Sequence, residues 1–241
     1  MIPLRDDNPT RIDPVVTVGI IAACVLAFLW QLSLGSGNQR AVLSLGVIPA
    51  VLFHKAALPP ELDVVAPWQT VFTSMFLHGG FMHIAGNMLY FWIFGNNVED
   101  AMGHRRFIVF YLLCGVAAAY GQALVNPASQ VPMIGASGAI SGVLGAYLLL
   151  FPRARVLVAI PLGLIVQTMH LPALVVLGFW FVLQLLNSAS MTGGEGGVAW
   201  FAHVGGFVAG MLLIPFFKHK DVPLLHPAHR RAGIEDFHRR W

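Results

Sequence analysis

The chain has 241 residues, of which 57% are hydrophobic and only 10% are charged. So little polar surface cannot cover a water-soluble globule, so the composition excludes an ordinary soluble enzyme and indicates a membrane protein. The formal net charge is +3. Because the basic residues do not gather into one patch, we expect no nucleic-acid partner.

Six apolar runs come close to the roughly 20 residues that a transmembrane helix needs. They are residues 15–34, 81–98, 107–125, 137–151, 172–187 and 198–217. The sequence therefore predicts an all-α, polytopic membrane fold with six transmembrane helices in one domain, residues 15–217. A cytoplasmic N-terminal segment, residues 1–14, precedes this domain, and a basic cytoplasmic tail, residues 218–241, follows it. The first run is expected to be an uncleaved anchor, because it is longer than the core of a signal peptide and nothing after Leu34 resembles a mature secreted domain.

The fifth span is the hardest to delimit. Residues 156–186 are apolar for longer than one span requires, and Pro161, Gly163 and Pro172 interrupt them. We therefore expect residues 156–170 to form an interfacial or partly buried linker and the fifth helix to start near Pro172.

Cysteines and histidines do not suggest a disulfide or a metal site. Cys24 and Cys114 fall inside the first and third spans, where they are expected to be small buried apolar side chains. The four histidines of the tail are irregularly spaced and form no evident ligand set. We therefore expect no bound metal.

The distribution of Lys and Arg predicts the orientation in the membrane. Twelve of the fourteen lie in the N-terminal segment, in the loops after the second and fourth spans, or in the tail. By the positive-inside rule these regions face the cytoplasm. The second, fourth and sixth spans then all run inward from the outer face.

Three polar side chains lie at matching depth in these inward-running spans. Ser137, His83 and His203 each lie 15 or 16 residues before the charged residue that closes their own span. At a rise of about 1.5 Å per residue, each is about 22 to 24 Å above the inner boundary of a hydrocarbon core about 30 Å thick. Ionisable groups at such a depth are costly and usually functional, so the pattern predicts one site near the outer surface.

A serine and a histidine in one layer are suited to nucleophilic catalysis, because the histidine can accept the serine's proton. We predict a dyad of Ser137 and His203, since no Asp or Glu lies at matching depth, and we expect packing to orient His203. Asn87 follows His83 by four residues and lies on the same helix face. His83, Asn87 and the backbone N–H of Ser137 are the expected oxyanion donors.

Glycines on two spans predict the close helix approach that the dyad needs. Gly138 and Gly142 are spaced as GxxxG in the fourth span, and Gly206 and Gly210 in the sixth. Such faces let helix backbones meet closely, although ordinary helix packing explains the pattern equally well on its own.

Three motifs resemble those of the rhomboid intramembrane serine proteases. Gly135-Ala136-Ser137-Gly138 resembles the family's GxSG, Ala202-His203-Val204-Gly205-Gly206 its AHxxG, and His83-Ile84-Ala85-Gly86-Asn87 its HxxxN. The similarity covers residues 68–215. Gly135, Gly138, Gly142, Gly206 and Gly210 are expected to support the site.

The resemblance implies a six-helix core with an active site that opens to water on the outer face. It implies transmembrane protein substrates, admitted sideways past the fifth span and in contact with membrane lipids, with small residues at the cut and a nearby helix-weakening sequence. It implies no metal or organic cofactor. For a compact chain without an organellar presequence, we expect the cytoplasmic membrane of a bacterium.

Two positions depart from the family pattern. Ser141 stands where some members carry a tyrosine that packs on the catalytic histidine, which leaves the orientation of His203 open. Gln69 stands where other members carry an arginine, which leaves the detailed fold of the first outer loop open.

Other interpretations remain for the chain and for single residues. A rhomboid-like pseudoprotease would bind membrane proteins without cutting them, but it should lack the serine or the histidine. A channel or transporter would need acidic groups or broken helices at the midplane, and neither is evident. Taken alone, Ser137 is a helix N-cap, and His83 and Asn87 could hydrogen-bond only the outer loop. His78, Glu99 and Asp100 are interpreted as structural.

Overall fold

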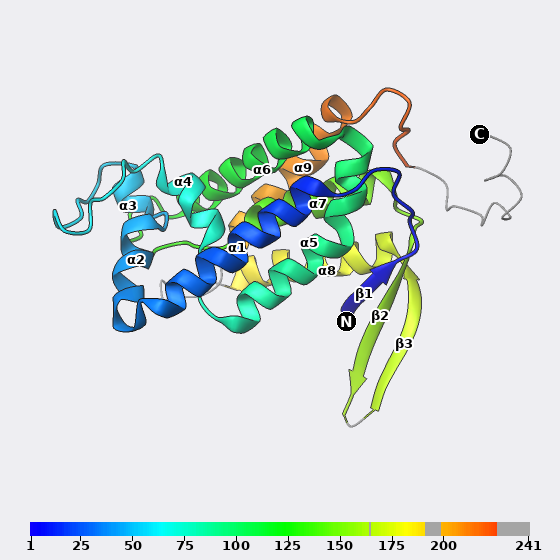
Figure 1. Cartoon of the computed structure of the whole chain (residues 1–241), viewed down its shortest axis with the longest axis horizontal. Helices are drawn as coiled ribbons and strands as arrows, with labels where there is room; N and C mark the ends of the chain where they lie inside the picture. Colours follow the sequence, from blue (N-terminus) through cyan, green and yellow to red (C-terminus); the bar gives the residue numbers. More distant parts are fainter. Residues whose placement is uncertain (164, 191–198, 226–241) are drawn as a thin grey trace, which may run out of the picture.

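The computed structural model describes residues 1–163, 165–190 and 199–225. Within these ranges, six helices of 14 residues or more form one bundle (Figure 1): α1 (Val15–Ser33), α5 (Phe81–Met102), α6 (His104–Val125), α7 (Ser137–Leu150), α8 (Ala173–Ser190) and α9 (Trp200–Phe217). Their bounds lie within a few residues of the six predicted runs. Val198, the predicted start of the sixth run, and residues 226–241 of the predicted tail lie outside the described residues.

The six helices differ in length and in apolar character. In the described part of the chain, α1, α6 and α9 are long and apolar enough to cross a membrane by length and composition. Helix α7 and residues 173–187 of α8 are shorter apolar helices. The chain is therefore mostly helical and carries several membrane-span candidates.

Helix α7 occupies the centre of the bundle and packs against α5, α6, α8 and α9. Nearly all of its residues are buried. Small side chains permit this arrangement: a Cβ added at Gly206 would overlap the carbonyl oxygen of Gly138, and one added at Gly210 would overlap that of Gly142. The close approach of α7 and α9 that the two GxxxG patterns predicted is confirmed.

One end of the bundle carries the segment between α1 and α5, which we call the outer loop (residues 34–80). It contains five short helices, namely η1 (Gly35–Gly37), α2 (Asn38–Leu45), α3 (Pro49–Leu52), α4 (Thr70–Thr73) and η2 (Ser74–Phe76) (Figure 1). Gln69 stabilises a turn here, because its Oε1 accepts a hydrogen bond from the N–H of Ala66 at 2.8 Å. Gln31 of α1 holds His78 through both backbone groups, at 2.9 and 3.2 Å. Burial, together with the nearby His83, lowers the pKa of His78 to about 4, so its ring is neutral at pH 7.

The opposite end of the bundle carries a three-stranded antiparallel sheet, and this corrects the prediction of an all-α fold. Strand β1 (Ile2–Asp6) pairs with β2 (Arg155–Leu162), which pairs with β3 (Ile165–Pro172). The hairpin of β2 and β3 extends away from the helices (Figure 1). Residues 156–170 are thus not a linker. Val156 and Val158 turn the same face toward the core while their neighbours are more exposed, which is the period-two burial that favours a strand.

Two carboxylates near the end of α5 anchor the start of α1. Glu99 is fully buried and accepts hydrogen bonds from the backbone N–H groups of Val16 and Thr17, at 2.9 and 2.8 Å. Asp100 accepts from those of Arg11 and Ile12. The first N–H groups of a helix have no intrahelical partner and favour negative charge, so this arrangement stabilises the N-terminus of α1. The structural interpretation of both carboxylates is confirmed.

Asp6 links the sheet to α7. The hydroxyl of Tyr147 donates a hydrogen bond of 2.5 Å to Asp6 Oδ2. Burial raises the pKa of Asp6 from 3.8 to about 6. The folded chain therefore holds this proton to higher pH than the unfolded chain, and this contribution to stability is lost as the pH rises from about 4 through about 6.

We expect Asp6→Asn to remove this pH dependence. The amide oxygen can still accept from Tyr147, but it carries no charge above pH 6. The free energy of unfolding of the variant relative to the wild type should rise by about 2 kcal/mol between pH 4 and pH 7. Thermal unfolding in detergent across this range measures it, and parallel curves for the two proteins would contradict the expectation.

Candidate active site

Ser137 and His203, which are 66 residues apart in the sequence, meet between α7 and α9. The Nε2 atom of His203 lies 2.8 Å from the Oγ atom of Ser137. Ser137 is the first residue of α7, and His203 lies in the first turn of α9 with 9% of its surface exposed. The structure therefore brings together the two residues that the sequence predicted as a dyad. A neutral imidazole with a free lone pair at Nε2 can accept the hydroxyl proton of such a serine.

Glycine at position 135 directs the chain into α7. Its φ of +125° is a conformation that other residues rarely adopt. Its N–H donates to the carbonyl oxygen of Ser74 at 2.9 Å, which ties this segment to the outer loop. A Cβ added here would lie 2.7 Å from His83 Nε2 and 3.6 Å from Ser137 Oγ. The absence of a side chain thus leaves room for His83 beside Ser137.

The orientation of His83 follows from its other ring nitrogen. The N–H of Gly79 donates to His83 Nδ1 at 3.2 Å, so a neutral ring carries its hydrogen on Nε2. That N–H faces the region next to Gly135 and Ser137. The ring also meets His78 edge-on at 5.2 Å. The geometry makes His83 a hydrogen-bond donor toward the dyad.

Asn87 lies one helical turn after His83 on α5. It is 8% exposed, and its Nδ2 has no hydrogen-bond partner among the described residues. Leaving a buried amide donor unpaired costs about 1 to 3 kcal/mol, so such a group is suited to a catalytic role or to binding a water or ion. Asn87 is therefore available to bind an oxygen atom from a bound molecule.

The ring of His203 is held by α8, which sequence reasoning did not foresee. His203 Nδ1 lies 2.7 Å from Gln184 Oε1. The ring of Trp180 lies 6.0 Å from that of His203 at a tilt of 41°, and the ring of Trp200 meets it edge-on. The prediction that packing orients His203 is thus incomplete, because a hydrogen bond also contributes. The available signal was an amide in an apolar helix, four residues after a tryptophan.

Ser141 does not replace an aromatic ring against His203. Its Oγ donates a hydrogen bond of 2.6 Å to the carbonyl oxygen of Ser137, one turn earlier in α7. This internal bond satisfies its hydroxyl in a buried position.

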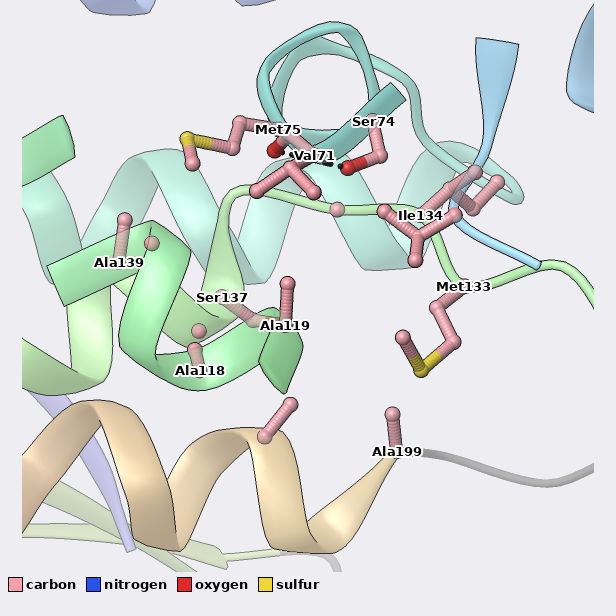
Figure 2. Close-up of a pocket in the computed structure, with 15 residues that line it drawn as sticks. Val71, Ser74, Met75, Ala118, Ala119, Met133, Ile134, Ser137, Ala139 and Ala199 are labelled. Carbon is pink, nitrogen blue, oxygen red and sulfur yellow. Dashed lines mark hydrogen bonds between the residues drawn. The ribbon is translucent and has the colours of Figure 1, made fainter. Parts of the chain in front are cut away.

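An open pocket lies beside Ser137 (Figure 2). Figure 2 shows Ser137 next to Ala118 and Ala119, with Met133 and Ile134 also lining the pocket. Eight of the fifteen lining residues are alanine or glycine. The lining consists of Val47, Val71, Ser74, Met75, Gly115, Ala118, Ala119, Met133, Ile134, Gly135, Ser137, Gly138, Ala139, Ala199 and Ala202. Such a lining suits a small apolar group next to the serine hydroxyl.

Comparisons with known proteins agree on one family. A family model described as "Rhomboid domain" matches residues 65–220. Rhomboid protease GluP of Bacillus subtilis is 30% identical over 203 residues, which is 83% of this chain but 35% of GluP. Putative rhomboid protease YdcA of the same organism is 29% identical over 204 residues, covering 84% of this chain and 88% of that protein. Rhomboid protein 1, mitochondrial, of Saccharomyces cerevisiae is 32% identical over 126 residues, covering 50% of this chain and 36% of that protein.

This chain spans about a third of the length of GluP and of the mitochondrial protein, whereas it matches YdcA over most of both chains. The matched region contains α5 to α9 and therefore Ser137, His203, His83, Asn87 and Gln184. The resemblance predicted from the three motifs is confirmed, and the chain belongs to the rhomboid family.

Proposed function

We propose that this protein is an intramembrane serine endopeptidase, which hydrolyses peptide bonds in or near the transmembrane segments of membrane proteins. The observation that carries the proposal is the 2.8 Å contact between Ser137 Oγ and His203 Nε2 beside an open pocket. Family membership and the names of the relatives GluP and YdcA support the same reaction.

The reaction begins when His203 Nε2 takes the hydroxyl proton as Ser137 Oγ attacks the scissile carbonyl carbon. The tetrahedral intermediate collapses, the C–N bond breaks, and His203 gives the proton to the leaving amine. A water molecule then loses its proton to His203 and attacks the acyl-serine ester, which releases the second product and restores the hydroxyl. No metal or organic cofactor is required for these steps.

The negative oxygen of the intermediate needs donors next to Ser137. We assign this role to His83 Nε2–H, Asn87 Nδ2–H and the backbone N–H of Ser137. The tautomer of His83 and the unpaired amide of Asn87 support the assignment. As the first residue of α7, Ser137 also presents an N–H at the positive end of a helix.

We expect Asn87→Ala to lower kcat by about 10²- to 10³-fold and to change KM little, because the donor acts mainly on the transition state. Initial rates over a range of substrate densities in liposomes separate the two constants. Asn96→Ala is a matched control on the same helix, since the Asn96 side chain caps only the next backbone N–H. Equal rates for Asn87→Ala and the control would show that Asn87 does not act as an oxyanion donor.

The membrane arrangement is part of the proposal. Six helices of the domain at residues 15–217 would cross a bacterial cytoplasmic membrane, with residues 1–14 and the tail at residues 218–241 in the cytoplasm and the site open to the extracytoplasmic side. Substrates would pass α8 from the lipid phase. Exposed apolar side chains along α8, such as Leu174 and Leu186, support contact with lipid or with a substrate helix. The small lining of the pocket favours a small side chain at the cut.

The test is cleavage of a defined substrate by the purified protein in liposomes. The substrate is a single transmembrane helix with an alanine and a helix-weakening glycine pair near its outer end, and mass spectrometry locates the cut. We expect two products with wild type and none with Ser137→Ala. If folded wild type cuts none of a panel of such helices, the proposal fails and a rhomboid-like pseudoprotease that binds membrane proteins becomes the better interpretation.

A further inference from the structure

We propose that Gln184 positions His203, acting from α8 as an uncharged third member beside the Ser137–His203 dyad. The proposal rests on the proposed function, because it assigns Gln184 a part in the same reaction. It adds a residue on a helix that carries none of the three motifs.

The hydrogen bonds at Gln184 determine which way its amide points. Its Nε2 donates to the carbonyl oxygen of Trp180 in the same helix at 3.4 Å. Its Oε1 then lies 2.7 Å from His203 Nδ1. Since an amide oxygen only accepts, His203 must carry its hydrogen on Nδ1. The lone pair of Nε2 is left facing Ser137 Oγ at 2.8 Å, which is the tautomer that a general base needs.

Burial strengthens the hydrogen bond between Gln184 and His203. Gln184 is 6% exposed and His203 is 9% exposed, so water competes little for either partner. A carboxylate at this place would bring a charge into an apolar layer at considerable cost. An amide supplies the same acceptor without a charge. Gln184 therefore fills the place that a buried aspartate occupies in soluble serine proteases.

Helix α8 makes a second contact with His203, through the ring of Trp180, and this contact also orients the imidazole. Trp180 precedes Gln184 by one helical turn, so both side chains lie on one face, and the Trp180 ring lies 6.0 Å from the His203 ring. Helix α8 thus holds the imidazole by one hydrogen bond and one ring contact. The base is aligned only while α8 packs against α9.

Gln184→Met tests the proposal, because methionine has nearly the same length but offers no comparable acceptor. We expect kcat to fall by about 10²-fold or more at unchanged KM. Gln184→Glu keeps an oxygen at the same place and is expected to restore most of the rate. Gln122→Met is the matched control: Gln122 accepts from the backbone N–H of Phe201 on α9 and does not touch the imidazole, so its loss should lower stability and leave kcat nearly unchanged.

A spectroscopic measurement separates this proposal from the cleavage reaction itself. In protein labelled with ¹⁵N-histidine, the signals of His203 are identified by their loss in His203→Ala. We expect the Nδ1–H tautomer in wild type and in Gln184→Glu, and a mixture of tautomers in Gln184→Met. If Gln184→Met keeps both the wild-type tautomer and the wild-type kcat, the proposal is overturned. If the wild type cleaves no substrate, the proposed function is wrong. The tautomer measurement would still decide whether Gln184 orients His203.

Discussion

Replacing Ser137 or His203 with alanine is expected to lower kcat by about four to six powers of ten, and the double variant is expected to be no slower than either single variant. The reason is that the two side chains act as one unit. The hydroxyl is a weak nucleophile without the base, and the base has no proton to accept without the hydroxyl. Cleavage rates in liposomes over several days measure such small residual activities.

Folding must be monitored in the same variants, since His203 is buried between α7, α8 and α9. Thermal unfolding in detergent serves this purpose, and Ser129→Ala is a suitable serine control, since Ser129 Oγ accepts from the backbone N–H of Val131 in an exposed turn. Additive losses in the double variant would show that the two residues act separately. Equal activity in all variants would assign the cleavage to another site or to a contaminating protease.

Replacing Gly210 with alanine is expected to destabilise the fold by about 3 kcal/mol or more. The added Cβ would overlap the carbonyl oxygen of Gly142, and this oxygen belongs to the backbone of α7. No rotamer change can relieve such an overlap, so α7 and α9 must move apart. Because Ser137 and His203 lie on these two helices, cleavage should fall together with stability.

Unfolding in mixed micelles of mild detergent and dodecyl sulfate measures the loss. Gly19→Ala in α1 is the matched control, since an added Cβ there meets no atom within 4 Å. This control is expected to stay within about 1 kcal/mol of wild type and to gain slightly from the helix propensity of alanine. If Gly210→Ala unfolds like the control, the two backbones do not pack as closely as described.

The helices were largely predictable from the sequence, because most of them are apolar runs closed by charged or turn-forming residues; only the start of the fifth was hard to place. The sheet was not predictable. Residues 156–170 are as apolar as a membrane helix, and their pairing with β1 joins segments about 150 residues apart. Local patterns cannot reveal so distant a partner. Val156, Val158 and Ile160 are β-branched residues at every second position, and this spacing was the available sign of a strand.

The site was predicted to a different degree for each residue. Ser137 and His203 were found because matching depth and short motifs identify them independently, and the structure places them in contact. His83 and Asn87 were also predicted; His83 presents Nε2 near Gly135 and Asn87 has an unpaired buried amide, and their role as oxyanion donors stays a prediction. The role of Gln184 was not predicted, because no sequence motif marks a single glutamine as part of a site. Its importance comes from the packing of α8 on α9, which only the three-dimensional fold reveals.

Because β1 pairs with a strand that lies about 150 residues later, the sheet can form only after both strands have been synthesised. A ribosome adds on the order of 5 to 20 residues per second, so β1 waits about 10 to 30 s for its partner strand to be made. During that time α1 and α5 to α7, which lie between the two strands in the sequence, are synthesised. The sheet, with the bond from Tyr147 to Asp6, can therefore form only after these helices have been made, and α8 and α9 follow it. It fastens one end of the bundle rather than guiding the formation of α1 and α5 to α7, and deleting residues 1–6 should leave these helices intact while shortening the lifetime of the folded protein.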